Sequence, residues 1–136
     1  MVTLDTNVAV YAFYDASPKA DVARSVLARV EFVSVQVLNE FANVTFRKRG
    51  RSSSDAAWGV ARIRAAVPEV MNIGAGHNTE ALRVADRYRL SFYDSLMIAV
   101  ALSAGATTLY SEDMQHRLLI DKRLRIVDPF RAEDAA

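Results

Sequence analysis

Residues 2–8 of the chain read Val-Thr-Leu-Asp-Thr-Asn-Val. The apolar Val2–Leu4 are typical of a short buried strand, and Asp5 stands where that strand ends, directly before a helix predicted over residues 6–14. Ligands of open parallel sheets bind outside the carboxyl ends of the strands. Asp5 is therefore a candidate site residue, although it could equally serve only as the N-cap of the following helix.

Beyond this segment, predicted strands and helices alternate along the chain. Strands are predicted over residues 31–35, 70–73, 107–110 and 125–127. Further helices are predicted over residues 18–30, 36–48, 52–66, 78–89 and 91–103, with a loop over 74–78. This alternation predicts an α/β fold with a central, mostly parallel sheet and helices on both faces.

Length and composition limit the possible classes of protein. The 136 residues predict one domain over 1–136, and 51% hydrophobic with 24% charged residues is typical of a globular chain. No cysteine is present, and two histidines are too few for a typical zinc site. The longest apolar run, Leu96–Leu102, is too short to cross a membrane, and the N-terminus lacks the basic segment of a signal peptide. We therefore expect a cytoplasmic protein that does not bind membranes.

Three further acids are predicted to lie near Asp5. Asp113 follows the strand at 107–110, Glu40 lies early in the helix after the strand at 31–35, and Asp94 starts a strongly apolar helix. Each has a plain alternative. Asp94 could form a capping box with Ser91, Asp113 could cap a short turn, and Glu40 could be an ordinary solvated residue.

Two patterns favour a shared site. Gln36, Glu40, Asn43 and Arg47 form a polar stripe beside the apolar face of their helix, which puts Glu40 at the edge of the buried surface. The helix that begins with Asp94 is apolar all round, which predicts that it is buried. Clustered carboxylates repel one another unless a cation neutralises them. All-oxygen ligands without clustered histidine or cysteine favour Mg²⁺, with Mn²⁺ as a substitute.

Other catalytic motifs are missing from the sequence. It contains no G-x-S-x-G elbow and no phosphate-binding G-x-x-x-x-G-K-[ST] loop. Gly74-Ala-Gly76 resembles the start of a dinucleotide-binding motif, but Thr79 occupies the position of its third glycine. A metal-dependent hydrolysis of phosphodiester bonds is the chemistry that the acids favour.

Five segments together resemble the PIN-domain family, and within it the VapC-type toxins of type II toxin–antitoxin systems. In chain order they are Leu4–Val8, Val37–Phe41, Leu90–Ser95, Thr108–Gln115 and Arg125–Phe130. The resemblance implies a Mg²⁺-dependent endoribonuclease that forms a homodimer and is blocked by a cognate antitoxin. A housekeeping RNA-processing nuclease and a catalytically silent module that binds RNA or a partner are the alternatives.

The resemblance also assigns residues. It places the acidic site on Asp5, Glu40, Asp94 and Asp113, with Asp5 and Asp94 as direct metal ligands. It matches Thr6 and Ser111 to hydroxyl positions near that site. Glu112 adjoins Asp113 and could supply the fourth carboxylate instead, but Asp113 is the residue that aligns with the family pattern.

The basic run Arg47-Lys48-Arg49-Gly50-Arg51 follows the helix that carries Glu40. It could simply end the helix, with cations at the negative end of the helix dipole and Gly50 as the C-cap. Arg47 and Arg49 could also contact RNA phosphates that flank a bond held at the metal. The two interpretations are compatible.

Overall fold

The computed structural model describes residues 1–48 and 52–131. Its strands are β1 (Val2–Leu4), β2 (Phe32–Ser34), β3 (Glu69–Met71), β4 (Thr108–Tyr110), β5 (Leu119–Ile120) and β6 (Leu124–Val127). Its α-helices are α1 (Thr6–Tyr14), α2 (Pro18–Leu27), α3 (Val35–Asn43), α4 (Ser53–Ala66), α5 (Ala75–Tyr88) and α6 (Phe92–Ser103). A π-helical segment, η1 (Val44–Lys48), continues α3. No helix in the described part of the chain is both long and apolar enough to span a membrane.

The strands form two short sheets. The larger has the order β1-β4-β6-β5, in which β1, β4 and β6 are parallel and β5 is antiparallel to β6. The smaller pairs β2 with β3 in parallel. The Thr3 hydroxyl donates to the carbonyl of Phe32 at 2.6 Å, which ties β1 to β2. The prediction of an α/β fold with a mostly parallel sheet is confirmed.

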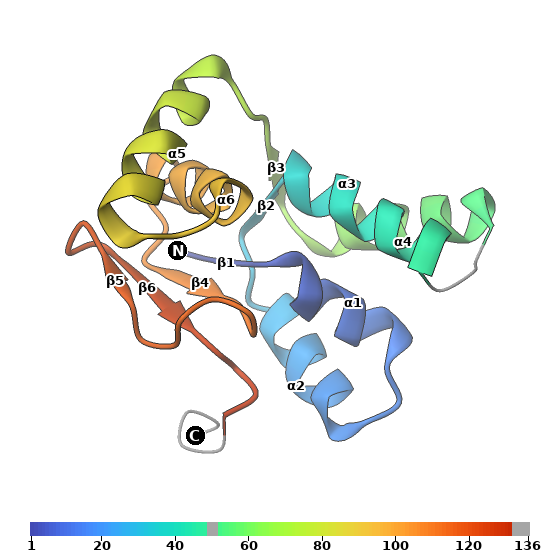
Figure 1. Cartoon of the computed structure of the whole chain (residues 1–136). Coiled ribbons are helices and arrows are strands. Elements are labelled where there is room, and N and C mark those ends of the chain that lie inside the picture. The colour runs from blue at the N-terminus through green and yellow to red at the C-terminus, as the bar shows by residue number, and fades with distance from the viewer. Residues whose placement is uncertain (49–51, 132–136) are drawn as a thin grey trace.

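The helices form three packed pairs around the sheets. The pair α5 and α6 packs together on one side, α1 and α2 pack together on the other, and α3 with α4 forms a further pair beside them (Figure 1). Gly59 allows the close approach of α4, because a Cβ atom there would lie 2.6 Å from the Phe41 ring. The core between these layers is apolar, and residues such as Leu4, Ile98 and Leu109 are fully buried.

Local sequence explains most helix starts. Ser17 caps α2 with Pro18 at its first position, Ser52 and Asp55 form a reciprocal capping box at α4, and the Ser91 hydroxyl caps α6. The carboxylate of Asp94 is not part of a box with Ser91, since the cap there consists of the Ser91 hydroxyl accepting from the Asp94 N–H.

Several predicted boundaries were wrong. Residues 75–78, predicted as part of a loop, are the first turn of α5, because the His77 ring accepts a hydrogen bond from the Gly74 N–H at 2.9 Å and so stabilises an earlier start. Helix α2 ends at Leu27 rather than at residue 30. The helix predicted over 36–48 changes to π-helical geometry at Val44. Strand β5 was not predicted.

Candidate active site

The carboxyl ends of β1 and β4 place two site residues side by side. Leu4 pairs with Tyr110 at the last register position, and the next backbone hydrogen bond runs from the Asp5 N–H to the Tyr110 carbonyl at 2.8 Å. Ser111, the residue after β4, then donates from its hydroxyl to Asp5 Oδ2 at 2.8 Å. The sheet therefore brings Asp5 and Ser111 together although 106 positions separate them in sequence.

Asp5 is both a helix cap and a cavity residue. Its Oδ1 accepts from the Thr6 N–H at 2.7 Å, so the N-cap interpretation holds. Its side chain is nevertheless part of the cavity wall, so the two interpretations are compatible. Burial raises the pKa of Asp5 to about 6 against the hydrogen bonds from Ser111 and Thr6, and the charges of Glu40 and Asp94 raise it further.

Glu40 reaches the same place from α3. Its Oε1 accepts from the Thr6 hydroxyl at 3.1 Å and from the Gln36 amide, also at 3.1 Å. The same amide donates to the carbonyl of Tyr93 at 3.1 Å, which links α3 to the start of α6. Gln36 and Glu40 therefore contact each other across one helical turn of the predicted polar stripe. Glu40 is exposed, but its carboxylate is hydrogen-bonded.

A cavity of about 380 Å³ lies at this edge of the sheet, and all four predicted acids line it. Its wall consists of Asp5, Thr6, Asn7, Val10, Tyr11, Glu40, Val44, Asp94 and Asp113. The carboxylates of Asp94 and Asp113 make no hydrogen bond or ion pair within the described residues. Asp113 does not cap the turn, because the Ser111 hydroxyl accepts the Met114 N–H at 3.2 Å.

Glu112 points to other partners. It pairs with Lys19 and Tyr11 and is not among the residues that line the cavity. Burial alone would raise the pKa of Glu112, but the hydrogen bonds from Lys19 and Tyr11 and the Lys19 charge outweigh it and lower that pKa. The structure therefore puts Asp113, rather than Glu112, at the cavity wall.

The donor set of this cavity suits a hard cation. Its wall contains four carboxylates, the Thr6 hydroxyl and the Asn7 amide, and within residues 1–47 and 52–131 it includes no lysine, arginine or histidine. No three acidic or histidine side chains of the described residues converge into a ready-made metal cluster. The carboxylates instead stand apart around the cavity, which fits an ion that keeps several waters and takes only one or two carboxylates directly.

Sequence reasoning missed part of this wall. Asn7 and Tyr11 line the cavity from α1, where they lie four residues apart on one helix face. A helical projection of residues 6–14 would have placed Asn7 and Tyr11 on one face of the helix that follows Asp5. Of the two arginines predicted to contact RNA, Arg47 lies exposed in η1 and does not line the cavity, while Arg49 lies outside the described residues.

Comparison with known proteins identifies the family. The PIN domain model matches residues 2–129. The chain belongs to the PIN-domain family. It is 31% identical over 119 residues to Ribonuclease VapC7 of Mycobacterium tuberculosis, a match that covers 83% of this chain and 82% of that protein. This PIN-domain protein is thus related to the VapC ribonuclease toxins.

Solved structures share its fold. The structure of VapBC2 from Rickettsia felis, bound to a DNA fragment from its promoter, matches with a TM-score of 0.69 at 18% identity, over 94% of this chain and all of the matched chain. VapC20 of Mycobacterium tuberculosis, a toxin that cleaves the sarcin–ricin loop, matches with a TM-score of 0.64 at 22% identity, over 80% and 87% of the two chains. A toxin–antitoxin complex from Klebsiella pneumoniae matches with a TM-score of 0.69 at 14% identity, over 96% and 98%.

Proposed function

We propose that this PIN-domain protein is a Mg²⁺-dependent endoribonuclease that uses Asp5, Glu40, Asp94 and Asp113 as its acidic site. The observation that carries the proposal is the cavity at the ends of β1 and β4, which collects these acids and has no cationic side chain among the described residues of its wall. The relation to a VapC ribonuclease supports RNA as the substrate class. A DNase could use the same carboxylates, so the choice of RNA rests on the relation to a ribonuclease, whereas a silent module would have no use for four carboxylates in one cavity.

The proposed roles of the acids are those that the family resemblance implies. Asp5 and Asp94 would hold the ion directly, with Glu40 and Asp113 acting through water. A bound divalent ion would supply an activated water and a positive charge beside the scissile phosphate. Ser111 and the Thr6 N–H fix the two oxygens of Asp5, and the Thr6 hydroxyl and Gln36 fix one oxygen of Glu40. Two carboxylates are thus held in place before any ion binds, which lowers the cost of organising the site.

The direct test uses purified protein and total RNA, with Mg²⁺, with Mn²⁺ and with a chelator. We expect new 5′ ends only when a divalent ion is present, and none with the Asp94→Asn variant. Intact RNA under all three conditions would refute the nuclease assignment. If single-stranded DNA were cleaved as fast as RNA, the assignment of RNA as the substrate class would be refuted.

We also propose that the protein is the toxin of a toxin–antitoxin pair. Several matched folds come from toxin–antitoxin complexes, including those from Rickettsia felis and Klebsiella pneumoniae. An antitoxin cation, such as an arginine, could pair with the acidic cavity and compete with the metal. Expression alone should arrest growth, and co-expression of a cognate antitoxin should restore it. Normal growth with active enzyme would leave a housekeeping nuclease.

The homodimer that the resemblance implies is part of the same proposal. Light scattering behind a sizing column should give twice the mass of the 136-residue chain. A monomer over the whole concentration range would refute this part alone, because each chain contains all four acids.

A further inference from the structure

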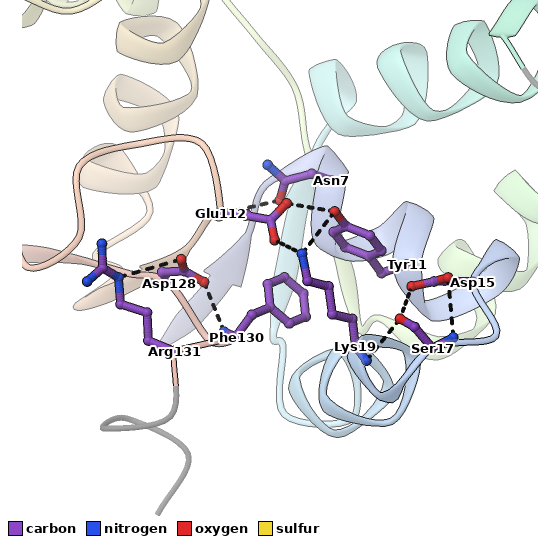
Figure 2. A network of polar contacts seen from close by, with 9 residues as sticks. All are labelled: Asn7, Tyr11, Asp15, Ser17, Lys19, Glu112, Asp128, Phe130 and Arg131. Atoms are coloured by element: carbon purple, nitrogen blue, oxygen red, sulfur yellow. Dashed lines mark hydrogen bonds and ion pairs between the residues drawn. The ribbon is translucent and has the colours of Figure 1, made fainter.

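Glu112, next to Asp113, is the centre of a polar cluster outside the cavity. Its Oε1 accepts from the Tyr11 hydroxyl at 2.7 Å, and its Oε2 pairs with Lys19 Nζ at 2.5 Å (Figure 2). Its backbone N–H donates to Asn7 Oδ1 at 3.4 Å. Tyr11 and Asn7 both line the acidic cavity, so Glu112 contacts two parts of the cavity wall from behind.

Lys19 contacts two aromatic rings in addition to the Glu112 carboxylate. Its Nζ lies 4.9 Å from the centre of the Tyr11 ring and 5.3 Å from that of Phe130. These two rings meet edge to face at 5.0 Å (Figure 2). The two rings and the Glu112 carboxylate favour this position of the ammonium group, although 43% of the Lys19 side chain is exposed. Helix α2 is thereby fastened to the segment that follows β4.

Asp113 depends on this segment for its position. Its own carboxylate makes no hydrogen bond or ion pair within the described residues, although it lines the cavity. On one side Ser111 is bonded to Asp5, and its hydroxyl accepts the Met114 N–H. The other anchor is Glu112, which carries the contacts to Lys19, Tyr11 and Asn7.

We propose that the Lys19–Glu112 ion pair, supported by Tyr11, positions Asp113 at the acidic cavity and keeps the Glu112 carboxylate out of it. Lys19 and Glu112 are positioning residues, because they act through Asp113 and through the cavity wall. Without Lys19, the Glu112 carboxylate would keep its Tyr11 hydrogen bond but lose its positive partner beside four other carboxylates, and their repulsion would displace the Ser111–Met114 segment. The inference rests on the proposed function for its kinetic readout.

A different role for Lys19 would leave a different signature. A lysine that bound an RNA phosphate would act on substrate affinity, and its loss would flatten the salt dependence of binding. A positioning pair acts instead on kcat and on the metal, and both partners matter equally. Glu112, an anion, could not share a phosphate-binding role.

The test compares Lys19→Met, Glu112→Gln and the charge swap Lys19→Glu/Glu112→Lys with the wild-type chain. Arg83→Met is the matched control, because Arg83 pairs with Asp121 at 2.5 Å and the two ion pairs have similar exposure, 43% and 23% against 41% and 23%. Cleavage is measured as kcat and KM well below the lowest melting temperature of the set. Mg²⁺ affinity is measured separately by calorimetry.

We expect each single variant of the Lys19–Glu112 pair to lower kcat about tenfold, the effect usual for groups that orient metal ligands, and to weaken Mg²⁺ binding with little change in KM. The charge swap should recover most of the loss, and Arg83→Met should lower only the melting temperature. The inference is overturned if kcat and Mg²⁺ affinity fall no further than in Arg83→Met. It is also overturned if Lys19→Met raises KM while Glu112→Gln does not, or if the swap is no better than the single variants.

Failure of the proposed function would look different. A wild-type chain that cleaves no RNA refutes the nuclease assignment, but its Mg²⁺ affinity still ranks the variants. Equal Mg²⁺ affinity in wild type, Lys19→Met and Glu112→Gln would then overturn the positioning role by itself.

Discussion

Two clusters of the same chemistry lie at opposite ends of the sheet. The carboxyl-edge cluster consists of Tyr11, Lys19 and Glu112, and the amino-edge cluster consists of Tyr88, Arg83 and Asp121. Each joins a tyrosine hydroxyl and a cation to one carboxylate. In each, the carboxylate side chain is 23% exposed.

Their surroundings differ. Asp121 lies in the turn between β5 and β6, where it and Lys122 adopt positive φ angles of 51° and 56° without being glycine. The Arg83 and Tyr88 contacts hold that turn against α5, and the Asp121 N–H donates to the Tyr88 hydroxyl at 2.8 Å. Glu112 instead borders the acidic cavity through Asn7 and Tyr11. The amino-edge cluster stabilises a backbone conformation, whereas the carboxyl-edge cluster contacts residues that line the acidic cavity.

The largest expected difference between the two ends is in cleavage. Asp94→Asn should lower kcat/KM by on the order of 100-fold or more, because metal coordination supplies several kcal/mol to the transition state. Asp121→Asn makes the same chemical change at the amino edge and should leave kcat/KM unchanged at a temperature where both variants are folded. Steady-state cleavage of a defined RNA checks both. Equal losses would show that the two ends are not functionally distinct.

Stability should change in opposite directions at the two ends. Burial raises the pKa of Asp5 from 3.8 to about 6, so its charge opposes folding above pH 6, and Asp5→Asn should stabilise the metal-free protein by about 3 kcal/mol there. The gain should shrink as the pH falls from 6 and disappear below about 4. Asparagine also caps helices well, so α1 keeps its cap.

Asp121→Asn should destabilise the protein instead. The hydrogen bonds from Arg83 lower the pKa of Asp121 in the folded state, so its contribution is present above the ordinary value of 3.8 and is lost as the pH falls below it. Denaturant unfolding of both variants at pH 4 and pH 7.5 measures this. A loss of stability in Asp5→Asn at pH 7.5 would show that the Asp5 charge does not destabilise the metal-free protein.

The smallest expected difference concerns RNA binding. Arg47 follows the helix that carries Glu40, whereas Arg87 lies exposed on α5 near the amino edge. If Arg47 contacts a phosphate, Arg47→Ala should reduce the slope of log Kd against log salt by about one, and Arg87→Ala should leave it unchanged. Binding of RNA at several salt concentrations checks this. An unchanged slope in Arg47→Ala would show that Arg47 does not contact a phosphate and serves only at the end of the helix.

The sequence predicted the carboxyl edge better than the amino edge for a physical reason. The acids follow short apolar strands or start a buried helix, and these local patterns placed Asp5, Asp94 and Asp113 where the structure has them. The turn at Asp121 and Lys122 carries no glycine or asparagine. Its backbone conformation depends on Arg83 and Tyr88, more than 30 positions away, so no local signal marked β5.

Other features that the sequence did not predict have different origins. The earlier start of α5 depends on the His77 ring, which is not a usual capping group, and the change to a π-helix at Val44 has no mark in the sequence. The Lys19–Glu112 pair joins residues 93 positions apart, so only the fold reveals it.

Calorimetric titration with Mg²⁺ tests the central claim, that the carboxyl-edge cavity is a divalent-metal site. The wild-type chain and Asp121→Asn should give the same saturable binding, and the Asp5→Asn/Asp94→Asn double variant should give none while remaining folded. Binding that survives in the double variant, or a wild-type chain that binds no Mg²⁺, would contradict the account.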